Sequence, residues 1–142
     1  MVKIKRMKLK PKSCALVLLT LLSISCAPQG NTIDAIIADY PHGERRIRVE
    51  QTGEACLSYG ARPQFQVIEP GIFSVENLHA QLQDHLHENR PREQWPDPTS
   101  ECGMVTVFFS DGTEKDFLIF DKAELMDQIF TQAEHNIVGE RL

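Results

Sequence analysis

Three histidines with acidic neighbours are the first residues of this 142-residue sequence whose types suggest metal chemistry. His79, His85 and His87 fall within one predicted helix, and Asp84 and Glu88 lie among them. A helical zinc site usually places two histidines four positions apart, so that both project from one face. No pair here has that spacing, and His85 and His87 point to opposite faces. We therefore expect a solvated polar face, with no bound metal or cofactor.

The sequence lacks the usual motifs of enzyme catalysis. No serine lies in the Gly-x-Ser-x-Gly elbow of hydrolases, and there is no glycine-rich phosphate loop. Asp111, Glu114 and Asp116 form an acidic group, but they surround a predicted hairpin tip and should face solvent. Acid–base catalysis by two carboxylates depends on their distance in space, which spacing along the chain does not reveal. The expected function is therefore non-catalytic.

The segment from Arg90 to Pro98 carries the only tryptophan, Trp95, in a stretch that its prolines keep extended. Tryptophan and arginine are the residues that most often anchor protein interfaces. Arg90, Arg92 and Trp95 are therefore a candidate partner-binding group. In the alternative interpretation, Trp95 folds back over the core and Cys102 ties the loop down.

Several short strands are predicted as the elements that must position these side chains. Their apolar patterns cover residues 45–52, 55–59, 64–69, 104–109 and 116–120. Ser110-Asp111-Gly112-Thr113 is typical of a hairpin turn between the last two. The strand 104–109 is apolar on both sides, which suits a central strand or a strand with an exposed binding patch.

Three helices are predicted from capping residues and apolar periodicity. The first covers residues 32–40, where isoleucines recur at helical spacing until Pro41 ends the pattern. Ser74 should cap the second helix, which extends to about Asn89. The third should begin in the capping box formed by residues 121–124.

Together these elements predict an α+β fold, a small antiparallel sheet with two main helices packed on it. Residues 72–89 and 119–136 also align with five identical positions, which suggests a duplicated ββα unit. A strand leading into a capped helix produces such similarity by itself, so chance resemblance is the alternative.

The N-terminal region is typical of a secretory leader. Residues 1–13 hold six Lys or Arg and no acid, and the apolar run 14–25 is too short to span a bilayer as a helix. Ser23-Ile24-Ser25 precedes Cys26, and a cysteine directly after small residues resembles the lipobox of bacterial lipoproteins. The resemblance implies cleavage after residue 25 and lipidation of Cys26. Ordinary signal-peptidase cleavage at the same bond is the alternative, because these residues also fit its small-x-small rule.

This resemblance divides the chain into a cleaved leader (1–25), a lipidated N-terminus with a tether (26–31) and a single domain (32–142). Once Cys26 is acylated, Cys56 and Cys102 are the remaining cysteines of the exported chain. They could pair in an oxidising compartment, and such a disulfide would contribute about 3–4 kcal/mol to stability. Two free thiols are the alternative.

Loss of the leader also makes the chain strongly acidic. The sequence has 15 basic and 20 acidic residues, and removal of the six leader bases leaves nine against 20, a net charge of −11. Such a charge disfavours nucleic acid and attracts a basic protein partner. Acyl chains rather than a basic patch would then hold the protein at the membrane, facing the periplasm. Ala27, in place of the Asp that retains lipoproteins at the inner membrane, favours the outer membrane.

Two functions agree with these features. The first is a membrane-anchored envelope lipoprotein with a non-catalytic accessory or interaction role, whose partner is an envelope protein. The second is an acidic periplasmic inhibitor or immunity protein that blocks a basic hydrolase. The second predicts a tight, salt-sensitive complex, whereas the first predicts co-purification with an envelope assembly and no inhibition.

Overall fold

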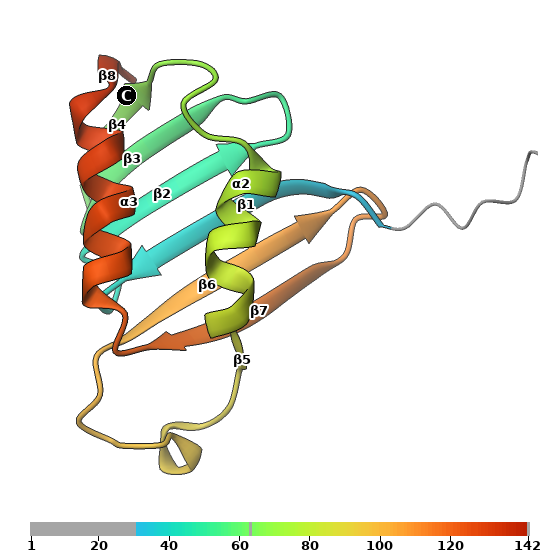
Figure 1. Ribbon diagram of the computed structural model, residues 1–142, viewed down its shortest axis with the longest axis vertical. Coiled ribbons are helices and arrows are strands. Elements are labelled where there is room, and N and C mark those ends of the chain that lie inside the picture. Colours follow the sequence, from blue (N-terminus) through green and yellow to red (C-terminus); the bar gives the residue numbers. More distant parts are fainter. Residues whose placement is uncertain (1–30, 63, 142) are drawn as a thin grey trace, which may run out of the picture. The chain divides into compact units, whose positions relative to one another are not determined.

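One eight-stranded antiparallel sheet and two helices are described by the computed structural model, which covers residues 31–62 and 64–141 (Figure 1). The strands are β1 (Ile33–Tyr40), β2 (Arg45–Glu50), β3 (Ala55–Tyr59), β4 (Phe65–Ile68), β5 (His87–Glu88), β6 (Cys102–Phe109), β7 (Glu114–Phe120) and β8 (Ile137–Arg141). The helices are α2 (Val75–Leu82) and α3 (Ala123–His135). These elements confirm the predicted α+β class. The leader and Cys26 lie outside the described residues.

The strand order is symmetric about its central pair. It runs β5-β7-β6-β1-β2-β3-β4-β8, with β1 and β2 in the middle and a hairpin on each side. Each hairpin leads into a helix, and the strand that follows that helix pairs with the opposite hairpin: β5 with β7, and β8 with β4. The chain thus contains two hairpin–helix units in equivalent positions, as the suggested ββα repeat requires. Whether they arose by duplication stays a prediction.

The core lies between one face of the sheet and the two helices, which cross that same face in Figure 1. Helix α2 packs on β1, and α3 packs on β2 and β3. The helices contribute buried residues at helical spacing: Val75, Leu78, Leu82, Met126, Ile129, Phe130 and Ala133. The sheet contributes alternate residues of its strands: Ile36, Ala38, Tyr40, Ile47, Val49, Leu57, Val105, Val107 and Ile119. Both described helices are therefore on one side, and the other face carries neither.

The prediction of a helix over residues 32–40 is wrong, because this segment is strand β1. It pairs with β2 on one side and β6 on the other, so it lies at the centre of the sheet. Ile36 faces the helices and is fully buried, while Ile37 faces the opposite side and is half-buried. A central strand with apolar residues on both faces does not alternate, and its isoleucines also fall at helical spacing.

The helix boundaries agree with the sequence in part. Ser74 does cap α2, since its Oγ accepts a hydrogen bond from the backbone N of Asn77 at 3.1 Å. This helix ends at Leu82, earlier than predicted, and gives way to a single 3-10 turn and then β5. The predicted capping box before α3 is wrong. Asp121 has a positive φ of 49°, and its carboxylate accepts a hydrogen bond from the backbone N of Glu101 instead.

Tyr40 closes one end of the core where β1 ends. Its hydroxyl donates to Glu101 Oε2 at 3.1 Å and accepts from the backbone N of Lys122 at 3.0 Å. Burial raises the pKa of this tyrosine to about 12. The contact joins β1 to the start of α3, so it connects the sheet with one of its covering helices.

Candidate functional site

The helix-free face of the sheet gathers apolar side chains and arginines in its centre. We define this face by Ile37 of β1, Arg46 and Arg48 of β2, and Met104 and Phe108 of β6. Ile37 pairs with Arg48 across β1 and β2, so their side chains lie on the same face of the sheet. Arg46 and Met104 both pair with Asp39, two residues further along β1, and therefore lie on this face as well. Met104 is 39% exposed, and the Arg48 guanidinium lies 5.9 Å from the centre of the Phe108 ring. An antiparallel sheet whose open face met only water would carry mostly polar residues there.

Arg46 has a structural partner on this face. Its Nε and Nη2 donate to the two carboxylate oxygens of Asp39 at 2.5 and 3.2 Å, across the β1–β2 pair. Asp39 is one of only two buried polar residues within 31–62 and 64–141, so the pair compensates a carboxylate that has lost water. The hydrogen bond from Arg46 raises the pKa of its guanidinium. We assign this pair to stability rather than to ligand binding.

Trp95 folds back onto the helix-free face at its β6–β7 edge, as the alternative interpretation describes. Its ring meets that of Phe120 edge-on, with centroids 5.2 Å apart, in a small cluster with Leu118 and Cys102. The indole Nε1 donates to the backbone O of Arg90 at 3.1 Å. The tryptophan is therefore half-buried and engaged within the chain.

The two arginines of the same loop differ in their surroundings. The Arg92 guanidinium lies 5.4 Å from the centre of the Trp95 ring and donates to the backbone O of Pro98 at 3.0 Å. Arg90 is half-buried, and its Nε has no hydrogen-bond partner among the described residues. A partner-binding role for Arg90, Arg92 and Trp95 stays a prediction.

The predicted Cys56–Cys102 disulfide is absent, since both thiols are free. Cys56 lies on β3 and Cys102 begins β6, and two strands, β1 and β2, separate them in the sheet. Three strand spacings of about 4.8 Å put the two backbones roughly 14 Å apart, whereas a disulfide needs Cα atoms within about 7 Å. Spacing along the sequence carried no information on this distance.

A hollow of about 380 Å³ opens on the helix-free face above Cys56. Its lining combines apolar residues with two arginines and two glutamates: Arg48, Glu50, Glu54, Ala55, Cys56, Phe65, Val67, Ile68, Pro70 and Arg141. Burial raises the pKa of the Cys56 thiol, and the neighbouring Arg48 and Arg141 oppose that effect. A thiol with a raised pKa is mostly protonated near neutral pH and is a weak nucleophile. Cys56 is thus not an activated nucleophile.

A second hollow of about 260 Å³ brings together Asp39, His42 and Cys102, three residue types that occur in nucleophilic catalysis. Their side chains do not form a relay. Asp39 is held by Arg46, and the Cys102 thiol donates to the backbone O of Gly103 at 3.3 Å. Burial raises the pKa of Cys102 as well. No sequence signal links these residues, because they come from separate strands and turns.

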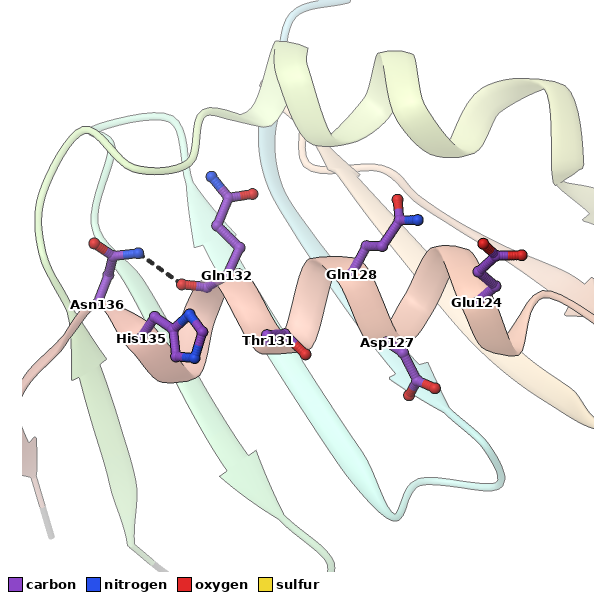
Figure 2. A pocket seen from close by; sticks show the side chains of 7 residues that line it. All are labelled: Glu124, Asp127, Gln128, Thr131, Gln132, His135 and Asn136. Carbon is purple, nitrogen blue, oxygen red and sulfur yellow. Dashed lines mark hydrogen bonds between the residues drawn. The ribbon is translucent and has the colours of Figure 1, made fainter.

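A third hollow, about 720 Å³, runs along the outer side of α3 (Figure 2). It is lined by one helix and the residue after it: Glu124, Asp127, Gln128, Thr131, Gln132, His135 and Asn136. Figure 2 shows these side chains fanning outward rather than converging. Asp127 is paired with Arg45, and Asn136 Nδ2 donates to the backbone O of Gln132 at 2.7 Å. This surface is a solvated helix face.

The histidines suspected of metal binding are divided among different elements. His79 lies on α2, His85 on the 3-10 turn and His87 on β5, where its ring packs against Phe120 with centroids 5.5 Å apart. Across the described residues, no group of three or more His, Cys, Asp or Glu is placed to hold a metal ion.

The hairpin between β6 and β7 is confirmed, and its acids are exposed. Asp111 Oδ1 accepts from the backbone N and the Oγ1 of Thr113 at 2.9 and 2.6 Å, which lowers the pKa of this carboxyl. Its other oxygen accepts from Asn31 Nδ2 at 2.7 Å, and Ser110 N donates to the backbone O of Thr32 at 2.9 Å. Hydrogen bonds therefore connect the residues just before β1 to the tip of the β6–β7 hairpin.

Comparison with protein families, with curated proteins and with solved structures found no match to this chain. Neither α2 nor α3 is long and apolar enough to cross a membrane, and the described residues contain no other candidate span.

Proposed function

We propose that this chain is a membrane-anchored envelope lipoprotein with a non-catalytic role, which binds an envelope protein through the helix-free face of its sheet. The anchor rests on Cys26 and the leader before it, and the binding role rests on the described domain. The observation that carries the binding role is the half-covered sheet, whose open face presents apolar residues and arginines together.

The composition of this face supports a protein partner. Met104 is 39% exposed, and the same face of the sheet carries Arg48 and the half-buried Phe108 and Ile37. Methionine, arginine and aromatic residues are enriched in protein interfaces relative to other surfaces. A mixed apolar and cationic surface of this kind suits a partner with apolar anchors surrounded by acids. The acidic net charge of the exported chain would then come from its other surfaces, such as α3 and the β6–β7 hairpin.

A matched pair of variants tests this function. Met104→Lys places a charge on the helix-free face, and Gln128→Lys makes the same change on the exposed side of α3. The unsubstituted protein, extracted from membranes in mild detergent, should co-purify with its partner. The partner should be lost with Met104→Lys and retained with Gln128→Lys. Equal capture by the two variants contradicts binding through this face.

Salt and enzyme assays separate the two function classes. Capture that persists at high salt, without inhibition of any hydrolase, supports the accessory role. A complex with a cationic hydrolase that dissociates at high salt and loses activity on binding supports the inhibitor alternative instead.

A further inference from the structure

Two sulfur donors and one imidazole line the 260 Å³ hollow at the end of β1. They are Cys102 and Met104 of β6 and His42 of the turn between β1 and β2. None of the three histidines on α2, the 3-10 turn and β5 belongs to this lining. Thiolate, thioether and imidazole are the side-chain donors that bind soft and borderline metal ions.

The backbone of β6 places both sulfur-bearing side chains on the helix-free face. Cys102 and Met104 are alternate residues of this strand, so their side chains leave the sheet on the same side, about 7 Å apart. The Met104 side chain has three rotatable bonds, and it is 39% exposed, so no packed core opposes its movement. Its sulfur can therefore turn toward Cys102 within the hollow.

The turn after β1 holds His42 next to Cys102. The backbone N of His42 donates to the backbone O of Cys102 at 2.9 Å, and the imidazole is exposed. His42 has a positive φ of 43°, in the left-handed region where strained non-glycine residues concentrate at functional sites. The imidazole thus reaches the hollow from the turn, while the two sulfurs reach it from the strand.

The other polar groups of the hollow do not favour a harder ion. Asp39 is the only carboxylate of the lining, and both of its oxygens accept hydrogen bonds from Arg46. Zinc sites draw their ligands from Cys, His, Asp and Glu, and within residues 31–62 and 64–141 no three such residues are placed together for a metal. A thiolate and a thioether in one site instead select Cu(I).

We propose that His42, Cys102 and Met104 bind one Cu(I) ion, through an imidazole nitrogen, a thiolate sulfur and a thioether sulfur. As the copper–sulfur bond forms, the Cys102 thiol loses its proton to solvent, and the oxidation state of the ion does not change. The thiolate and the monovalent ion together carry no charge, which suits a sulfur whose residue is only 4% exposed. This inference goes beyond the proposed function, and its test requires neither a membrane nor a protein partner.

Competition for Cu(I) tests the site. The protein carrying Cys14→Ser and Cys26→Ser is reduced, kept free of oxygen and titrated with the Cu(I) complex of bicinchoninate, a coloured chelator. One equivalent of Cu(I) should pass from the chelator to the protein, and the ultraviolet absorption of a thiolate–Cu(I) bond should grow in parallel. An equal amount of Zn²⁺ should leave that absorption unchanged, because the site lacks a third donor of the kind that zinc prefers.

A matched pair of cysteine variants identifies the thiolate. Cys102→Ser should abolish the ultraviolet absorption. Cys56→Ser removes the other thiol of the described domain, which lines a different hollow, and should leave the absorption unchanged.

Variants of the other two ligands do not depend on the buried cysteine. Met104→Leu and His42→Asn should each weaken Cu(I) binding by at least about tenfold, since loss even of groups that only orient metal ligands costs 10–100-fold. Asparagine tolerates left-handed backbone, so His42→Asn keeps the turn. His135→Asn, on the exposed side of α3, is its matched control and should bind Cu(I) unchanged.

Three results would overturn the proposal. The first is that no Cu(I) leaves bicinchoninate for the protein. The second is an absorption that survives Cys102→Ser and disappears with Cys56→Ser, which places the thiolate in the other hollow. The third is an unchanged affinity for Cu(I) in both Met104→Leu and His42→Asn.

Discussion

Replacing Gly103 by alanine should strongly destabilise the domain, because β6 passes too close to β1 for a side chain at this position. A Cβ on Gly103 would lie 2.2 Å from the backbone O of Asp39, 2.6 Å from Cδ2 of Tyr40 and 3.1 Å from Cγ2 of Ile119. The first two distances are shorter than real Cβ contacts. One of the two atoms is backbone of the central strand, which is hydrogen-bonded on both sides and has little freedom to shift.

The expected magnitude follows from this geometry. Overpacking a core costs about 1–3 kcal/mol when side chains can yield, and a backbone clash places Gly103→Ala near or above the upper limit. Alanine also lowers the conformational entropy of the unfolded chain, and this effect offsets up to about 1 kcal/mol of the destabilisation. The net loss should therefore be at least roughly 2 kcal/mol. With a urea dependence of about 1–3 kcal/mol per molar, a loss of roughly 2 kcal/mol should lower the unfolding midpoint by roughly 0.7–2 M.

The assay is urea unfolding followed by the fluorescence of Trp95, which is packed against Phe120 in the folded state. Gly139→Ala is the matched control, because Gly139 is also a strand glycine and no atom lies within 4 Å of a Cβ added there. This control should keep or slightly raise the midpoint. If Gly103→Ala and Gly139→Ala have the same midpoint, the close approach of β6 to β1 is refuted.

Three further outcomes are expected. Cys26→Ser should move the protein from the membrane fraction to the soluble fraction, and a variant that stays membrane-bound and normally processed contradicts the lipid anchor. On the unfolded, unreduced protein, Cys56 and Cys102 should both react with a thiol reagent, whereas a disulfide-linked peptide pair would contradict the free thiols. Stability should fall at alkaline pH, because burial raises the pKa of Tyr40 from 10.0 to about 12 and the unfolded chain ionises first. This stabilisation is complete below pH 10 and is lost toward pH 12. Tyr40→Phe should therefore lessen the fall in urea midpoint between about pH 9 and about pH 11, leaving the part due to Tyr59, whose pKa is also raised to about 12. An unchanged fall counts against a buried, neutral Tyr40.

Much of the fold could be predicted from local sequence patterns. The β6–β7 hairpin follows from Asp111-Gly112, and the start of α2 follows from Ser74, because turn and cap chemistry depend on neighbouring residues. The segment 32–40 could not be assigned in the same way. Its isoleucines satisfy a helical period and also a strand buried on two sides, and only its pairing with β2 and β6 decides between them.

The candidate site was less accessible to sequence reasoning. Apolar residues on both sides of 104–109 did suggest a central strand or a binding patch, and Met104 and Phe108 lie on the helix-free face. The hollow over Cys56 joins residues from β2, β3, β4 and β8, whose closeness depends on the strand order. The same order separates Cys56 from Cys102, so the cysteine count suggested a bond that the sheet does not allow.

The hydrogen bonds between the start of β1 and the β6–β7 hairpin tip have a mechanical consequence. A pull from an anchor preceding Asn31 would enter the domain at the first residues of β1 and act along that strand. The hydrogen bonds of β1 to β2 and to β6 lie across this direction, so both ladders would be loaded in shear and would have to yield together. An edge strand such as β8, bonded on one side only, would instead peel away one pair at a time. An anchor at the N-terminus would therefore load the domain through a strand that is hydrogen-bonded on both sides.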